Sequence, residues 1–182
     1  FKSIGQMFDK SVRAFRERTA YINMGKSVTY GELDGLSRDF AAYLQSLGLK
    51  KGARIAIMMP NLLQYPVCIY GALRGGYTVV NCNPLYTPRE LEHQLKDSGA
   101  ELIVIVENFA SVLQECIART PIKHVVVTSL GDLLGFPKSM IVNFVVKRVK
   151  KMVPVWHIDG AIEFRDALAR GAAATFTPVA VA

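Results

Sequence analysis

The stretch VTSLGDLLGFPKS, residues 127–139, holds the residue types from which phosphate-binding loops are built. Hydroxyls, glycines and a lysine can together surround a phosphate with N–H and O–H donors. The residues of these types are Thr128, Ser129, Gly131, Gly135 and Lys138. Leucines interrupt them, however, and the carboxylate of Asp132 would repel a phosphate. This stretch is therefore not predicted to bind phosphate.

Other motifs of nucleotide chemistry are missing from the chain. It has no G-x-G-x-x-G after an apolar run and no G-x-x-x-x-G-K-[ST]. The glycines of RGGY, residues 74–77, come before an expected strand, whereas a phosphate needs the N–H groups at the start of a helix. No Ser-His-Asp or Cys-His arrangement can be assigned either. We therefore assign no catalytic or cofactor-binding residue to this chain.

Cysteine and histidine are too scattered to indicate a metal site. The three cysteines, Cys68, Cys82 and Cys116, lie far apart, and no pair has the spacing of a metal or redox motif. An odd number of separated cysteines is typical of buried thiols in a reducing compartment. The three histidines do not cluster. No metal ligand is predicted.

A basic segment carries most of the net charge of +7. Residues 138–153, KSMIVNFVVKRVKKMV, contain five cations and no acid. As a helix, the segment would gather its apolar side chains in one broad arc, with Lys147, Lys150 and Lys151 opposite and Arg148 reaching past the apolar side. The expected apolar arc consists of Ile141, Val142, Phe144, Val145, Val149 and Met152.

Two readings of this basic helix stay open. A basic amphipathic helix can lie in the interface of an anionic membrane, and the contact residues would then be Phe144, Lys147, Arg148, Lys150 and Lys151. The same helix can instead pack its valines on the domain and leave its lysines in solvent. Nucleic acid is not an expected partner, because no aromatic residues alternate with the cations.

Apolar runs and amphipathic stretches alternate along the chain. Runs such as ARIAIMM and ELIVIV are apolar enough to be covered on both faces. This alternation predicts an α/β fold in which a mostly parallel sheet carries helices on both faces. The expected strands are 20–24, 27–29, 53–59, 77–82, 101–106 and 124–129, and the expected helices are 3–17, one from Thr29 to Gly48, one capped by Asn61, 88–98, 108–118 and 161–170.

Two helix starts are specified in detail. In YTPREL, residues 86–91, Thr87 and Glu90 have the spacing of a capping box, and proline follows the cap at the first helical position. VTYGEL, residues 28–33, repeats the device with Thr29 and Glu32. Both glutamates are thereby engaged as caps, which makes them poor candidates for acid–base catalysis. By itself, this pattern indicates helix initiation and no reaction.

Two long stretches resemble the N-terminal part of adenylate-forming acyl-CoA synthetases. They are SVTYGELDGLSRDFAAYLQSLGLKKGARIAIMMPN and GALRGGYTVVNCNPLYTPRELEHQLKDSGAELIVI. Within that superfamily the chain is most similar to the bacterial long-chain fatty-acid–CoA ligases, and VVNCNPLYTPRELEHQL is the most specific piece. The resemblance covers nearly the whole chain. Residues 133–156 are similar to a basic amphipathic insertion that those ligases carry.

The resemblance implies a two-step reaction for the parent protein. A fatty-acid carboxylate attacks the α-phosphate of magnesium–ATP, and the thiol of coenzyme A then takes the acyl group and releases AMP. The family's phosphate loop and catalytic residues lie downstream of the matched region. Residues 1–182 are therefore expected to be the N-terminal part of the large adenylation domain, inactive alone and without bound ATP, magnesium or coenzyme A.

Several expectations accompany this interpretation. The chain begins at Phe1 and not at a methionine, which suggests a trimmed protein. It has no signal-peptide pattern, and the expected location is the cytoplasm, peripheral on the inner membrane. The alternatives are a non-catalytic α/β module that binds anionic membrane through residues 138–153, and a ligase for another acid such as an aryl acid. Apolar surface at a sheet edge would also favour self-association.

Overall fold

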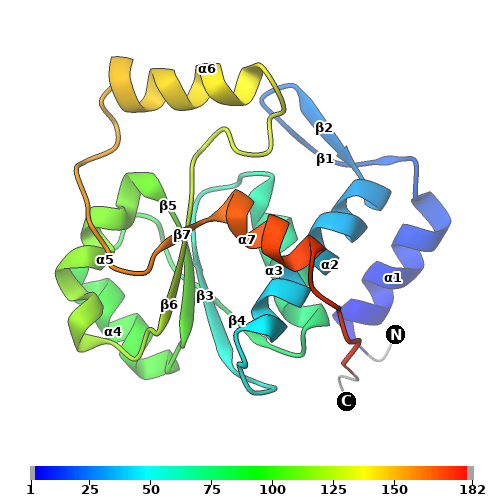
Figure 1. Cartoon of the computed structure of the whole chain (residues 1–182), viewed down its shortest axis with the longest axis horizontal. Coiled ribbons are helices and arrows are strands. Elements are labelled where there is room, and N and C mark those ends of the chain that lie inside the picture. The colour runs from blue at the N-terminus through cyan, green and yellow to red at the C-terminus, as the bar shows by residue number, and fades with distance from the viewer. Residues whose placement is uncertain (1–2, 180–182) are drawn as a thin grey trace.

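The computed structural model describes residues 3–179 as an α/β fold built on one parallel sheet (Figure 1). Its five strands follow the spatial order β4-β3-β5-β6-β7, and every neighbouring pair is parallel. The predicted fold class is therefore confirmed. The strands are β3 (Arg54–Met58), β4 (Thr78–Asn81), β5 (Leu102–Val106), β6 (His124–Thr128) and β7 (Ile162–Glu163).

Alternation along the central strands divides the core between the two faces of the sheet. Ile55 and Ile57 point to one face, whereas Ala56 and Met58 point to the other. All five residues of β5 are buried, as expected for a central parallel strand covered on both sides. Neither face of the sheet centre is left to solvent.

Each face carries its own group of helices. One core cluster joins residues from α1, α2, α3 and α7, and the other joins residues from α4 and α5. Figure 1 shows these two groups on opposite sides of the strands. The helices are α1 (Ile4–Phe15), α2 (Tyr30–Ser46), α3 (Gln64–Arg74), α4 (Pro88–Ser98), α5 (Ala110–Cys116) and α7 (Phe164–Ala172).

Both predicted capping boxes are confirmed. The Thr87 hydroxyl accepts from the Glu90 N–H, and the Glu90 carboxylate accepts from the Thr87 N–H at 2.8 Å. Thr29 and Glu32 repeat this arrangement at the start of α2. The backbone N–H donors of the two threonines hold the pKa of each glutamate below its ordinary value. These carboxylates therefore stay ionised as structural caps.

Two elements stand apart from the layers. A two-stranded antiparallel hairpin, β1 (Thr19–Asn23) and β2 (Lys26–Thr29), precedes α2. Helix α6 (Lys138–Phe144) continues as a π-helical turn, Val145–Val149. In Figure 1, α6 lies across the top of the molecule, above the ends toward which the parallel strands run, and the hairpin tip lies beside its first turn.

Some local predictions were wrong. Asn61 does not cap α3, which begins at Gln64 after Leu63 without any side-chain cap. The last helix begins at Phe164, because Ile162 and Glu163 first pair with β6 as β7. The sequence GAAATFTPVAVA, residues 171–182, has the composition of a linker; residues 173–179 form no regular element, and residues 180–182 lie outside the described part of the chain.

The predicted burial of the thiols is confirmed. All three cysteines are free and buried, two of them fully. Burial raises the pKa of the Cys82 thiol to about 11 and shifts the pKa values of Cys68 and Cys116 in the same direction. Near neutral pH these thiols are protonated and shielded, so they are packing residues.

A close backbone contact between α2 and α7 depends on Gly171. A Cβ atom placed there would come within 1.8 Å of the Asp39 carbonyl oxygen of α2. Because that oxygen belongs to the backbone, no side-chain rotation can relieve the clash. We therefore expect Gly171→Ala to lower the free energy of unfolding by about 3 kcal/mol or more, the upper end for overpacking, as measured by urea denaturation.

Gly35 offers a matched control on α2. A Cβ atom there meets nothing within 4 Å. Gly35→Ala should leave stability unchanged or raise it by about 1 kcal/mol, since alanine is the better helix former. Equal stabilities of the two variants would contradict the close α2–α7 packing.

Candidate functional site at the carboxyl edge of the sheet

The strand order points to the carboxyl edge between β3 and β5. From β3 the chain moves outward to β4 and then crosses back to β5 on the other side of β3. In open parallel sheets, ligands bind outside the carboxyl ends of the strands at such a reversal. Pro60 and Asn61 follow β3 there, and Glu107 and Asn108 follow β5. These residues therefore line the position where the fold favours a site.

Glu107 is a buried carboxylate directly after the central strand. Its side chain is only 4% exposed, and its Oε2 lies 2.7 Å from the Nζ of Lys147, which descends from the π-helical turn after α6. Among residues 3–179, the second oxygen, Oε1, has no hydrogen-bond partner, and neither does Oδ1 of the neighbouring Asn108. Two buried acceptors at this edge are thus left for a donor outside the described chain, such as water.

A second polar network anchors α6 to the loop after β6. Asp132 accepts hydrogen bonds from the Thr128 hydroxyl at 2.9 Å and from the Asn143 amide of α6 at 3.2 Å. Asn143 in turn accepts from the Gly131 N–H at 2.8 Å. Buried Gln64 of α3 donates to Thr128 and to the Ser129 carbonyl. Four elements thereby meet at one point of the edge.

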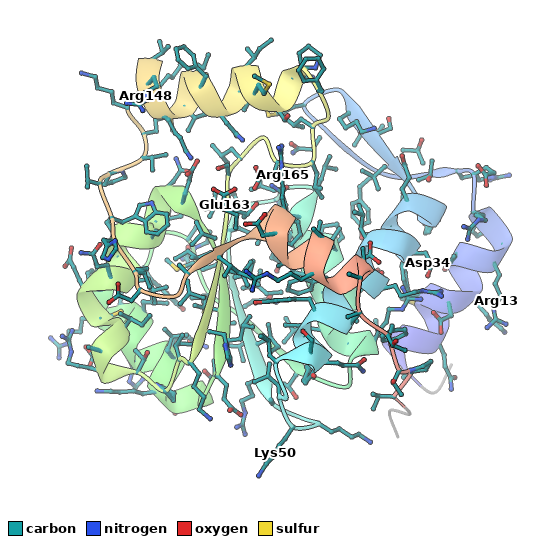
Figure 2. All side chains as sticks on the ribbon, in the orientation of Figure 1. Arg13, Asp34, Lys50, Arg148, Glu163 and Arg165 are labelled. Atoms are coloured by element: carbon teal, nitrogen blue, oxygen red, sulfur yellow. The ribbon has the colours of Figure 1, made fainter. Side chains whose placement is uncertain are left out.

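A small cavity lies between these two networks. Its volume is about 210 Å³, and its polar lining includes Glu107, Ser129, Asp132, Lys147 and Glu163. Figure 2 shows Glu163 and Arg165 near the end of β7 and the start of α7, below α6. The cavity is therefore enclosed by the strand ends and by the helix that covers them.

The chemistry of this edge does not suit a triphosphate. Three carboxylates and one lysine line the cavity, so even with the Lys147–Glu107 pair its lining carries a net negative charge that disfavours phosphate oxygens. Among residues 3–179 there is also no group of three or more His, Cys, Asp or Glu side chains that could hold a metal ion. The lining of this cavity therefore does not suit magnesium–ATP, and it is suited to neutral or cationic hydrogen-bond donors.

Phe144, Arg148, Lys150 and Lys151 lie exposed on or just after the covering helix. Figure 2 shows Arg148 projecting outward from the end of this helix. Lys147 differs from the other cations because it turns inward to Glu107. Four of the five predicted contact residues are thus available on the surface, and the fifth holds the helix down.

The structure divides the predicted apolar arc between solvent and the domain: Ile141, Phe144, Val149 and Met152 are exposed, whereas Val142 and Val145 are half-buried. Ile141 and Phe144 are 58% and 61% exposed, whereas Ser139 and Val146 face the domain. The physical reason is that Asp132 and Glu107 need donors beneath the helix, and Asn143 and Lys147 supply them. The apolar side chains that remain exposed are Phe136, Met140, Ile141, Phe144, Val149 and Met152, and we call them the outer face.

A larger cavity, about 970 Å³, lies elsewhere, among α1, α2, α3 and α7. Arg74 lines this cavity, pairs with Asp34 at 2.6 Å and donates to the Ser37 hydroxyl at 2.8 Å. Asp9 lies 3.5 Å from the same guanidinium. Because these partners neutralise Arg74, it is a structural residue, and the carboxyl edge is the better candidate.

Glu107 and Gln64 were not foreseen as residues of a site. A signal for Glu107 was present, because a lone acid directly after a run of five apolar strand residues is positioned at a strand end. Gln64 gave no such signal, since a glutamine near a helix start is common on protein surfaces. Its burial follows from the position of Thr128 across the sheet edge.

No helix among residues 3–179 has both the length and the hydrophobicity that crossing a bilayer requires.

Comparison with known proteins gives matches over most of the chain. The chain is 55% identical over 172 residues to a long-chain-fatty-acid–CoA ligase of Escherichia coli O6:H1, an alignment that covers 94% of this chain. It spans about 31% of the length of that curated relative.

Solved structures agree with this result at the level of the fold. A long-chain-fatty-acid–CoA ligase from Archaeoglobus fulgidus matches 98% of this chain with a TM-score of 0.71 at 21% identity, and the match covers 32% of that structure. A benzoate CoA ligase from Burkholderia xenovorans matches 97% of the chain, and 29% of its own length, with a TM-score of 0.68 at 22% identity. Because these relatives are named for different acids, the shared fold does not distinguish the substrate.

The family model for AMP-binding enzymes matches residues 8–174 and therefore includes the strands, the carboxyl edge and the covering helix. The chain belongs to the AMP-binding enzyme family.

Proposed function

We propose that these residues are the N-terminal part of the adenylation domain of a long-chain fatty-acid–CoA ligase. The observation that carries this proposal is the 55% identity to a bacterial ligase of that name over 94% of the chain. The proposed reaction joins a fatty acid to coenzyme A through an acyl-adenylate and releases AMP and pyrophosphate. ATP, magnesium and coenzyme A are its cofactors and co-substrate.

Within that enzyme, we propose that this part acts as a scaffold and does not hold the triphosphate. The carboxylates at its carboxyl edge disfavour phosphate, so the groups that neutralise ATP must come from other parts of the protein. The sheet contributes a rigid floor, and α6 contributes a cover held by Lys147 and Asn143. No catalytic step is assigned to a residue of this chain.

The prediction for the ligase proposal concerns activity. Residues 1–182 alone should show no palmitate-dependent formation of acyl-CoA, whereas the gene product that continues past residue 182 should form palmitoyl-CoA and AMP. The measurement is acyl-CoA formation by mass spectrometry with ATP, magnesium and coenzyme A.

Benzoate serves as the competing acid in the same assay. If the longer protein prefers benzoate, the proposed substrate changes from a fatty acid to an aryl acid. Turnover by residues 1–182 alone would contradict the scaffold role. Absence of turnover with either acid in the longer, folded protein would contradict the ligase proposal itself.

We further propose that α6 attaches the protein to the cytoplasmic face of the inner membrane. The supporting observation is an exposed apolar strip beside cations: Ile141 and Phe144 project outward, and Arg148, Lys150 and Lys151 lie next to them. From residue 133 to residue 158 the sequence contains no acid. Anionic lipid complements this surface in both charge and hydrophobicity.

This attachment would bring the carboxyl edge close to the lipid, because α6 lies directly above it (Figure 1). A second copy of the chain is the competing occupant of the outer face, which is a different surface from the sheet edge at which the sequence led us to expect self-association. Binding to vesicles that contain no other protein is expected if lipid occupies the outer face, and it is not expected if a second copy of the chain does. Vesicle binding therefore distinguishes the two occupants.

Reversal of the three outer cations tests the membrane proposal. Arg148→Glu, Lys150→Glu and Lys151→Glu together should weaken binding to phosphatidylglycerol vesicles at least about tenfold, since each cation near an anionic surface contributes about 1 kcal/mol. Vesicle co-sedimentation at low and high salt is the measurement, and salt should weaken the unmodified protein's binding.

The matched control reverses three exposed cations on other surfaces: Arg13→Glu, Lys50→Glu and Arg89→Glu. Figure 2 places Lys50 at the end of the molecule opposite α6 and Arg13 at its far side. Equal loss of binding in both triple variants would mean that net charge alone attracts lipid, and unchanged binding in the α6 variant would overturn the proposal.

A further inference from the structure

The tip of the β1–β2 hairpin has an unusual residue for its backbone geometry. Asn23 pairs with Lys26, so Met24 and Gly25 form a two-residue turn. Their φ angles are 48° and 72°, which is the left-handed region at both positions. Such turns favour asparagine, aspartate and glycine, and a methionine there is disfavoured by contact of its Cβ with the backbone.

Neither core cluster of the described residues includes Met24, so its side chain has no packing role that would explain methionine at this position. The Met24 side chain is 52% exposed, so it contributes little to either core cluster. An apolar side chain that is both conformationally disfavoured and exposed to water has a structural cost without a packing benefit. Residues kept in this way are concentrated where a protein binds something.

The hairpin tip is held against the first turn of α6. The Lys138 side chain of α6 donates a hydrogen bond to the Met24 carbonyl oxygen. On the other side of the turn, the Asn23 side-chain amide donates to the Asn61 carbonyl at 3.0 Å, after β3. Figure 1 shows the tip of the hairpin at the end of α6 where that helix begins. Two segments separated by more than a hundred residues therefore form one rim.

The rim has the same chemistry on both of its parts. On the α6 side, the outer face begins with Phe136 and Met140, which are 84% and 62% exposed. On the hairpin side, residues 19–29 contain Lys26 and no acid. Exposed apolar side chains beside cations match an anionic bilayer, whose headgroups attract the cations and whose acyl region accepts the methionine and phenylalanine.

We infer that the hairpin tip is a second membrane contact, and that Met24 enters the lipid interface together with the outer face of α6. This inference rests on the proposed membrane attachment through α6. If α6 were the single membrane contact, the whole protein could roll on the lipid surface about the axis of that helix. A second contact beside the first turn of α6 prevents this rotation. The hairpin thereby sets the orientation in which the carboxyl edge meets the lipid.

Met24→Asn separates membrane contact from folding. Asparagine suits the left-handed turn, so the melting temperature should stay the same or rise by about 2–4 °C. Binding of the protein to protein-free phosphatidylglycerol vesicles should nevertheless fall about three- to tenfold, because an apolar side chain is lost from the interface. If Met24→Asn weakens vesicle binding without lowering the melting temperature, the loss of binding is not caused by misfolding.

The matched control is Met7→Gln on α1, where the methionine is 41% exposed and lies on another element. It should bind vesicles as the unmodified protein does. Because the native cysteines are buried, Met24→Cys and Met7→Cys can each be labelled with an environment-sensitive dye. Vesicles should shift the emission of the dye to the blue at position 24 and leave it unchanged at position 7.

The outcomes distinguish the two proposals. If the α6 charge reversal abolishes binding while Met24→Asn binds normally and the dye at position 24 does not respond, the second contact is wrong and attachment through α6 stands. If no variant or unmodified protein binds vesicles, both proposals fall. Loss of a dimer in sedimentation with Met24→Asn, without any vesicle binding, would assign the rim to a second copy of the chain.

Discussion

The structure around α6 depends on one constraint: buried acceptors at the strand ends must be given donors. Glu107 ends the central strand inside the protein, and Asp132 lies in the loop after β6. A buried carboxylate without a partner is strongly unfavourable, so Lys147 and Asn143 must face inward. Their inward position leaves Ile141 and Phe144 on the outside, and the same constraint therefore produces both the covered edge and the exposed apolar strip.

How much of this could be predicted depended on the range of the interactions. The two capping boxes and the parallel strands were predictable because their signals are local: Thr87 and Glu90 are three residues apart, and β5 is apolar throughout. The orientation of α6 was not predictable, because it depends on an ion pair between Lys147 and Glu107, a carboxylate forty residues earlier in the sequence. Gln64 was expected inside a helix begun by Asn61, but the position of its side chain is fixed by a hydrogen bond to Thr128 of β6.

The structure also indicates that this part of the protein has a structural role that is distinct from nucleotide binding. Its helices and sheet form a double-sided core, while the described part of its carboxyl edge presents carboxylates and two buried acceptors without a protein donor. We propose that nucleotide chemistry belongs to other parts of the enzyme and that this part supplies position. Under the proposed membrane attachment, the outer face and the hairpin tip would determine how this part of the protein is oriented on the lipid surface.

A double-mutant cycle on Lys147 and Glu107 tests the central claim most directly. Lys147→Met leaves the Glu107 carboxylate without its partner and should lower the free energy of unfolding by about 2 kcal/mol, reduced from a fully buried pair because the lysine is 44% exposed. Adding Glu107→Gln should recover most of that loss, with a coupling energy of about 1–3 kcal/mol. Losses that add within about 0.5 kcal/mol would contradict the claim that this pair holds α6 over the sheet.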